Sequence, residues 1–277
     1  MKLAVVSIHG MGKQEENFAD AMHLELQGRF GGQPGDLVFD KIFWADVLSG
    51  AEDKLFERVT KTQDLDFVKL RRFIVNALGD AIAYQPLKEG ADPKVKDVYV
   101  QVHEKVAACL QRVTEKAGEK APLVILAHSL GSVIISNYLW DLWKPSSTEN
   151  PPVAPGSPLE RGETLAGLVT FGCPIALWSL RYPDFGEPIP FPHSKLATHY
   201  PKAKAQWLNL FDQDDVLAYP LRDVNASYKK VVTEDAQVSV GGLFTGWSPL
   251  SHNGYWTDDD FTKRVAALLT KLAKDTQ

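Results

Sequence analysis

Apolar and polar positions along the chain form blocks that predict short buried strands separated by helices. Each short apolar run ends at glycine, proline or polar residues, which is typical of a strand buried on both faces. The predicted strands are residues 3–8, 37–44, 123–127, 165–171 and 207–211, with one or two more within 231–240. Longer stretches predict helices at 14–28 (closed by Gly28), 51–78, 95–117, 131–143 and 261–274.

This alternation of strands and helices indicates an α/β fold, with a mostly parallel central sheet and helices on both faces. We interpret residues 1–277 as a single domain with a helical insertion at about 50–117, because no stretch has the composition of an interdomain linker. Two proline-rich stretches, 145–162 and 181–201, are predicted to be loops. The second contains Phe185, Ile189 and Phe191, which suggests the hypothesis of a mobile lid over an apolar site.

The pair His128-Ser129 lies between an apolar run that predicts a strand, 123–127, and a stretch that predicts a helix, 131–143. A serine in this place lies on a sharp turn that exposes its hydroxyl, so the residues two before and two after it must be small. Ala127 and Gly131 meet that demand. The following helix directs its N-terminus toward the serine, which favours negative charge there. Ser129 is either a nucleophile or a simple helix N-cap, and the strand–turn–helix context favours the nucleophile.

The stretch around Ser129 resembles the nucleophile elbow of α/β-hydrolases, whose common form is G-x-S-x-G. Ala127 replaces the first glycine, as in some lipases of that superfamily. The T-F-G-C-P sequence at 170–174 is similar to a T-F-G-x-P strand end of lipase-like hydrolases. The resemblance implies an α/β-hydrolase fold with a lipase-like or esterase-like activity.

A glycine-rich loop follows the first predicted strand. Its sequence, His9-Gly10-Met11-Gly12, resembles the oxyanion loop of bacterial lipases. The resemblance implies an oxyanion hole formed by the backbone N–H groups of Met11 and Leu130, the latter directly after the nucleophile. We expect His9 to brace the loop rather than to act as a base.

In the superfamily that this chain resembles, the acid and then the histidine follow the serine in the sequence. His252 lies in a loop after the last predicted strand, whereas His193 and His199 come too early. The acid is expected in the segment after the strand 207–211, whose carboxylates are Asp212, Asp214 and Asp215. The segment 215–219 looks like the D-P-V-A-Y segment of DDHD-type phospholipases, which favours Asp215, whereas a D-x-V pattern as in class 3 lipases would select Asp214.

These residues predict a serine hydrolase that cleaves carboxylic esters through a Ser129–His252–Asp215 triad and an acyl-enzyme. The expected substrate is a small-molecule or lipid-like ester, and the mechanism needs no cofactor or metal. A thioesterase or acyltransferase with the same triad is the alternative, and an inactive binding protein with this fold is a third interpretation. Four tryptophans near predicted strand ends or site loops are candidates to line an apolar acyl pocket: Trp44, Trp178, Trp247 and Trp256.

Composition narrows the expected partners and compartment. The formal net charge of −5 argues against nucleic-acid binding, which needs a basic face. No apolar run is long enough to span a bilayer, and the N-terminus lacks the pattern of a signal peptide. Cys109 and Cys173 lack the spacing of metal ligands, and two cysteines are too few for a disulfide framework. We therefore expect a cytoplasmic protein with two free thiols.

Overall fold

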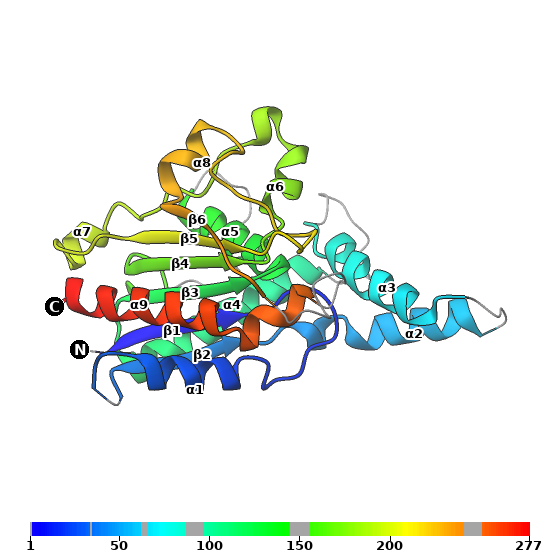
Figure 1. Ribbon diagram of the computed structural model, residues 1–277, viewed down its shortest axis with the longest axis horizontal. Coiled ribbons are helices and arrows are strands. Elements are labelled where there is room, and N and C mark those ends of the chain that lie inside the picture. The colour runs from blue at the N-terminus through cyan, green and yellow to red at the C-terminus, as the bar shows by residue number, and fades with distance from the viewer. Residues whose placement is uncertain (1, 34, 62–65, 87–96, 145–155, 241–250) are drawn as a thin grey trace.

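A parallel β-sheet forms the centre of the protein. The structure is a computed structural model that describes residues 2–33, 35–61, 66–86, 97–144, 156–240 and 251–277. In this part of the chain, six strands form one sheet in the order β2-β1-β3-β4-β5-β6, and every neighbouring pair is parallel (Figure 1). The strands are β1 (Leu3–Ile8), β2 (Leu37–Ile42), β3 (Leu123–His128), β4 (Leu165–Phe171), β5 (Gln206–Phe211) and β6 (Glu234–Gln237). This architecture confirms the predicted α/β fold.

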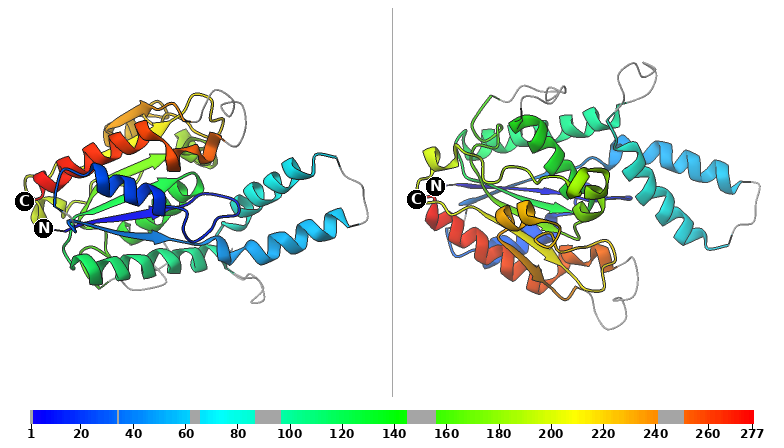
Figure 2. Two further views of the ribbon diagram at one scale, coloured as in Figure 1. Left: turned by 60° about the horizontal axis from the view of Figure 1, so that its bottom comes forward. Right: turned by 90° about the horizontal axis from the view of Figure 1, so that it is seen from above.

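Helices cover both faces of the sheet, as Figure 2 shows. The main covering helices are α1 (Asp20–Arg29), α4 (Val98–Ala117), α5 (Leu130–Trp143) and α9 (Asp259–Asp275). Helices α4 and α5 pack on one face, and α1 and α9 pack on the other. Because both faces are buried, the inner strands consist almost entirely of apolar residues.

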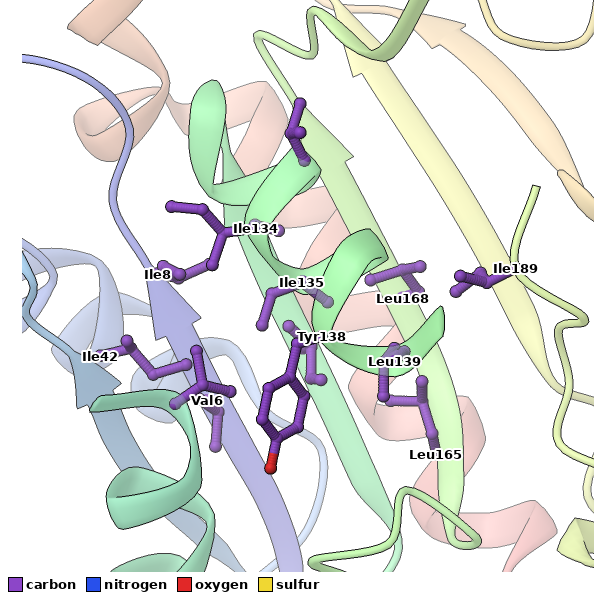
Figure 3. Close-up of a cluster of buried hydrophobic side chains, with 14 of the residues drawn as sticks. Val6, Ile8, Ile42, Ile134, Ile135, Tyr138, Leu139, Leu165, Leu168 and Ile189 are labelled. Carbon is purple, nitrogen blue, oxygen red and sulfur yellow. The ribbon is translucent and has the colours of Figure 1, made fainter. Parts of the chain in front are cut away.

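Two hydrophobic cores follow from the alternation of side chains along each strand. Strand β1 directs Val6 and Ile8 into one core and Val5 into the other. Figure 3 shows Val6 and Ile8 together with Ile134 and Tyr138 of α5 in the first core. This packing fixes the first turns of α5, and with them the residue that precedes the helix, against the carboxyl end of β1.

The prediction of one helix at 51–78 is wrong, because the structure has two helices there. Helix α2 (Ser49–Thr60) and helix α3 (Val68–Ala83) lie side by side and project past the sheet beyond the carboxyl ends of its strands (Figure 2). Phe67 has a left-handed backbone (φ 58°, ψ 39°), which cannot continue a right-handed helix. We refer to α2 and α3 as the helical arm.

Other boundaries also differ from the predictions. Helix α1 begins at Asp20 rather than near residue 14, and it includes Gly28, which does not end it. The remaining short elements are η1 (Ala45–Val47), α6 (Ile175–Trp178), η2 (Ser179–Arg181), η3 (Pro183–Phe185), α7 (Leu196–His199), α8 (Ala226–Val231) and η4 (Ser251–Thr257). None of the helices in the described ranges combines the length and the apolarity needed to span a membrane.

The proline-rich stretch 181–201 contributes to the core. Ile189 and Phe191 are buried in the same core as α5, with the ring of Phe191 edge-on to that of Trp207. Phe185 is half-exposed. That this stretch opens as a lid stays a prediction, and residues 145–155 of the first proline-rich stretch lie outside the described residues.

A buried carboxylate joins the start of β4 to the segment around α7. The carboxylate of Glu163 accepts hydrogen bonds from Arg161 Nε (2.8 Å) and Lys195 Nζ (2.7 Å), and it lies 3.2 Å from His199 Nε2. The hydrogen bond from Arg161, together with those from Lys195 and His199, lowers the pKa of Glu163 to about 2.

We predict that Glu163→Gln destabilises the protein in a pH-dependent manner. A carboxyl whose pKa is lower in the folded than in the unfolded chain stabilises the fold above its unfolded pKa and loses that effect as the pH falls toward the folded value. The variant should therefore unfold at a lower urea concentration than the wild type at pH 7, and the difference should shrink between about pH 4.5 and 2. Glu187→Gln, at an exposed carboxylate, is the control and should change little; an equal effect of both variants would contradict the prediction.

Candidate active site

Ser129 occupies a strained turn between β3 and α5. Its backbone has φ 52° and ψ −128°, a conformation that non-glycine residues rarely adopt. Its N–H donates to Phe171 O (2.9 Å), and its side chain makes no capping hydrogen bond with α5. The simple N-cap interpretation therefore does not hold, and the hydroxyl is free for another partner. Gly131 is required here, because a Cβ at that position would lie 2.6 Å from His9 O.

The partner of Ser129 is His252, 123 residues further along the chain. Ser129 Oγ lies 2.6 Å from His252 Nε2, and His252 Nδ1 lies 2.8 Å and 3.0 Å from the two carboxylate oxygens of Asp215. An ionised carboxylate can only accept hydrogen bonds, so Nδ1 carries the proton and Nε2 presents a lone pair to the serine hydroxyl. The structure thus brings Ser129, His252 and Asp215 into one hydrogen-bonded line.

The surroundings of Asp215 keep its carboxylate ionised. Burial by itself would raise the pKa of Asp215, but hydrogen bonds from His252, from the Leu217 N–H (3.0 Å) and from the Tyr255 hydroxyl (3.0 Å) together lower it. Asp214, the alternative acid, is exposed and does not reach His252 in the described contacts. Of the two carboxylates, that of Asp215 is the one within hydrogen-bond distance of His252.

The loop after β1 lies directly against Ser129. A Cβ at Gly10 would lie 2.3 Å from Ser129 Cβ, so only glycine allows this approach. Met11 follows and packs partly against the core. On the other side, Leu130 is the first residue of α5, and the first N–H groups of a helix have no partner within it. Of the two predicted oxyanion-hole residues, Leu130 directly follows the serine, and Met11 follows Gly10, which packs on it.

His9 holds the beginning of this loop in place. Its Nδ1–H donates to Gly10 O (2.8 Å), and its Nε2 accepts from the Trp44 backbone N–H (3.0 Å). The indole of Trp44 stacks on the imidazole and donates to His9 O (3.0 Å). Burial lowers the pKa of His9 to about 4, so the ring is neutral at pH 7. These contacts agree with the expectation that His9 braces the loop.

Three residues of the site were not identified from the sequence. His128 donates from Nε2 to the backbone oxygen of His252 (2.7 Å), and burial keeps its pKa well below the ordinary value, so it is neutral. Tyr255 links Asp215 to the backbone N–H of Asp212. Gly172 leaves room for the imidazole of His252, because a Cβ there would lie 3.0 Å from its Cε1. The sequence offered a signal for two of these residues, since His128 adjoins Ser129 and Gly172 belongs to the T-F-G-C-P segment, and none for Tyr255.

A cavity of about 630 Å³ lies along α5. Its walls combine the aromatic side chains of Tyr99, Trp140, Trp178, Tyr182, Phe185 and Tyr228 with the charged side chains of Asp141, Lys144, Arg181 and Glu187. Val133, one helical turn after Ser129, and Ile175 bring the cavity toward the site. Of the four tryptophans proposed for an acyl pocket, only Trp178 lines this cavity. Trp44 and Trp256 are buried in the two cores, and Trp247 lies outside the described residues.

The described residues do not form a metal site, and their two cysteines are not reactive thiolates. No three His, Cys, Asp or Glu side chains among them are grouped as metal ligands would be. Both cysteines are free and fully buried. Burial raises the pKa of Cys173 to about 12 and that of Cys109 well above its usual value, so neither is a thiolate at neutral pH.

We predict that Gly10→Ala destabilises the protein by about 1–3 kcal/mol, the usual effect of overpacking a core. The added methyl group would clash with Ser129 and push the loop and the elbow apart. The free energy of unfolding from urea titrations measures the effect. Gly28→Ala is the matched control, since a Cβ inside α1 meets nothing within 4 Å and should be neutral or stabilising. Equal stability of Gly10→Ala and the wild type would contradict the packing described above.

Comparisons with known proteins provide no second line of evidence for the chemistry of this site. No protein-family model matches the chain, and no curated protein matches its sequence. The interpretation of the site therefore depends on its own geometry, which joins Ser129, His252 and Asp215 beside a glycine-rich loop.

Proposed function

We propose that this protein is a serine hydrolase that cleaves carboxylic esters. The observation that carries the proposal is the hydrogen-bonded line from Ser129 Oγ through His252 to Asp215, with the serine on a strained turn. Backbone strain such as that at Ser129, in a residue whose side chain is hydrogen-bonded to a histidine, is typical of active sites. Nucleophile, base and orienting acid within hydrogen-bond distance are the signature of covalent catalysis by serine.

The proposed reaction has two halves, the formation of an acyl-enzyme and its hydrolysis. His252 Nε2 takes the proton of Ser129 while Oγ attacks the ester carbonyl, and Asp215 stabilises the imidazolium without taking the proton. The N–H groups of Met11 and Leu130 stabilise the oxyanion. His252 then protonates the departing alkoxide, leaving an acyl-enzyme. A water molecule, deprotonated by His252, attacks this ester, and the returning proton restores the Ser129 hydroxyl.

The arrangement of the site along the fold supports an α/β-hydrolase assignment. The nucleophile lies between a central parallel strand, β3, and α5, with the acid after β5 and the histidine after β6. The order serine, acid, histidine and the strand–turn–helix context of the serine are those of the α/β-hydrolase elbow. The T-F-G-C-P segment ends β4 beside the same site, where Phe171 O holds the Ser129 amide.

The neighbouring cavity supports an apolar substrate. Its six aromatic side chains suit an acyl or alkyl group, and its charged side chains suit a polar end of the substrate; Val133, one turn after Ser129, lines it, although Ser129, His252 and Asp215 do not. Ser129 has no solvent-accessible surface and His252 is almost fully buried. A substrate can therefore reach the hydroxyl only when part of the surrounding structure moves, which makes turnover dependent on an opening step.

Covalent labelling tests the nucleophile. A fluorophosphonate probe should modify the wild-type protein once, at Ser129, as read by intact mass and peptide mapping. Ser129→Ala should abolish the modification, whereas Ser136→Ala, on the same helix, should retain it. An unlabelled wild type would contradict the hydrolase proposal and favour the inactive binding protein instead.

Turnover of 4-nitrophenyl esters of graded chain length tests the triad. Ser129→Ala and His252→Ala should each lower kcat by about 10⁴-fold, and Asp215→Asn by about 10²–10⁴-fold, because the amide no longer fixes the imidazole tautomer. Asp214→Asn removes the same charge one residue away and should stay within about twofold of the wild type. Loss of activity in Asp214→Asn but not in Asp215→Asn would contradict the assignment of the acid.

A further inference from the structure

The helical arm contacts the loop that contains Met11. The backbone N–H of Gly12 donates to Asp80 Oδ2 at 2.7 Å, across 68 residues of sequence. Asp80 belongs to α3 and is only 3% exposed. Met11 therefore lies between two fixed neighbours, with Gly10 packed on Ser129 and Gly12 hydrogen-bonded to the arm.

Packing does not hold Gly12 in place. A Cβ at this position would meet nothing within 4 Å, and the residue has φ +87°, a conformation that glycine adopts easily. The peptide that carries the Met11 N–H is held at the start of the loop, where its carbonyl, Gly10 O, accepts from His9 Nδ1 (2.8 Å). The hydrogen bond to Asp80 is thus the contact that orients the second half of the loop, including the peptide that follows Met11.

Glu52 of α2 places a second carboxyl beside Asp80. Burial and the proximity of Asp80 raise the pKa of Glu52 to about 8, and burial raises that of Asp80 to about 6. Asp53, the other acid near Glu52, is exposed and pairs with Arg72 (2.9 Å). At neutral pH Glu52 therefore holds its proton and can donate it in a hydrogen bond to Asp80, which remains an ionised acceptor for Gly12.

We propose that Asp80 is a positioning residue for the oxyanion hole, in which the helical arm, through the Asp80–Gly12 hydrogen bond, anchors the far end of the loop that carries the Met11 N–H. This role rests on the proposed hydrolase function. It assigns a task to an insertion that contributes little to the two cores, and it connects the arm to catalysis without contact with the reacting atoms. Removal of the acceptor should weaken stabilisation of the transition state and leave ground-state binding unchanged.

The test compares Asp80→Ala with Asp80→Asn, whose amide oxygen can still accept the Gly12 hydrogen bond. With 4-nitrophenyl acetate, Asp80→Ala should lower kcat about 10–100-fold with KM within about twofold, below the loss expected for deleting an oxyanion donor. Affinity for a trifluoromethyl ketone, which forms an oxyanionic adduct with the serine, should fall by the same factor. Asp80→Asn and the control Asp53→Asn should stay within about threefold of the wild type in both measurements.

Different outcomes separate this role from the function on which it rests. An active wild type with unchanged kcat and ketone affinity in Asp80→Ala would overturn the positioning role alone. So would a rise in KM at constant kcat, or equal losses in the alanine and asparagine variants. A wild type that neither hydrolyses the ester nor binds the ketone would overturn the hydrolase proposal and this role with it. If Asp80→Ala does not fold, Asp80→Leu, of similar shape but without an acceptor, gives the same comparison.

Discussion

The hydrogen bond between the hydroxyl of Ser129 and His252 Nε2 is the contact on which the other features of the site depend. It joins residues 123 positions apart, so it forms only if the sheet brings their strand ends together. Parallel strands achieve this, because their carboxyl ends all lie at one edge (Figure 1). The loop after β1, the elbow after β3, Gly172 after β4, Asp215 after β5 and His252 after β6 meet at that edge.

Close packing around this bond makes glycine necessary at three positions. Gly10, Gly131 and Gly172 each face a neighbour that a Cβ would approach to 3.0 Å or less: Ser129, His9 O and His252 respectively. The Asp215 carboxylate is satisfied by four hydrogen-bond contacts within the site, whereas His128 Nδ1 is buried without a partner among the described residues. The same packing thus buries Ser129 and His252 and fixes their orientation, and it also restricts access of a substrate to the Ser129 hydroxyl.

The sequence allowed prediction of those parts that depend on local pattern. The apolar runs predicted the strands, because strands buried on both faces are apolar throughout. The small residues around Ser129 predicted the sharp turn, because its sterics exclude larger side chains. Tyr255 and Asp80 could not be found in this way, since their roles arise only from packing between distant segments. The break in the arm was missed although residues 60–64 are all polar, because the stretch contains no proline or glycine, and the left-handed backbone at Phe67 is not visible in the sequence.

The helical arm shows why an insertion can matter to a site without entering it. An oxyanion hole needs an N–H whose direction is set before the charge develops, and the loop that carries the Met11 N–H is hydrogen-bonded to His9 at its start and to Asp80 at its end. In our proposal Asp80 restrains Gly12 from a buried position, where the carboxyl of Glu52 lies beside it and burial raises the pKa of both groups. The glycine that lets the loop approach Ser129 lacks a side chain that could anchor it, and in our proposal a contact from outside the loop, at the amide of Gly12, provides that anchor.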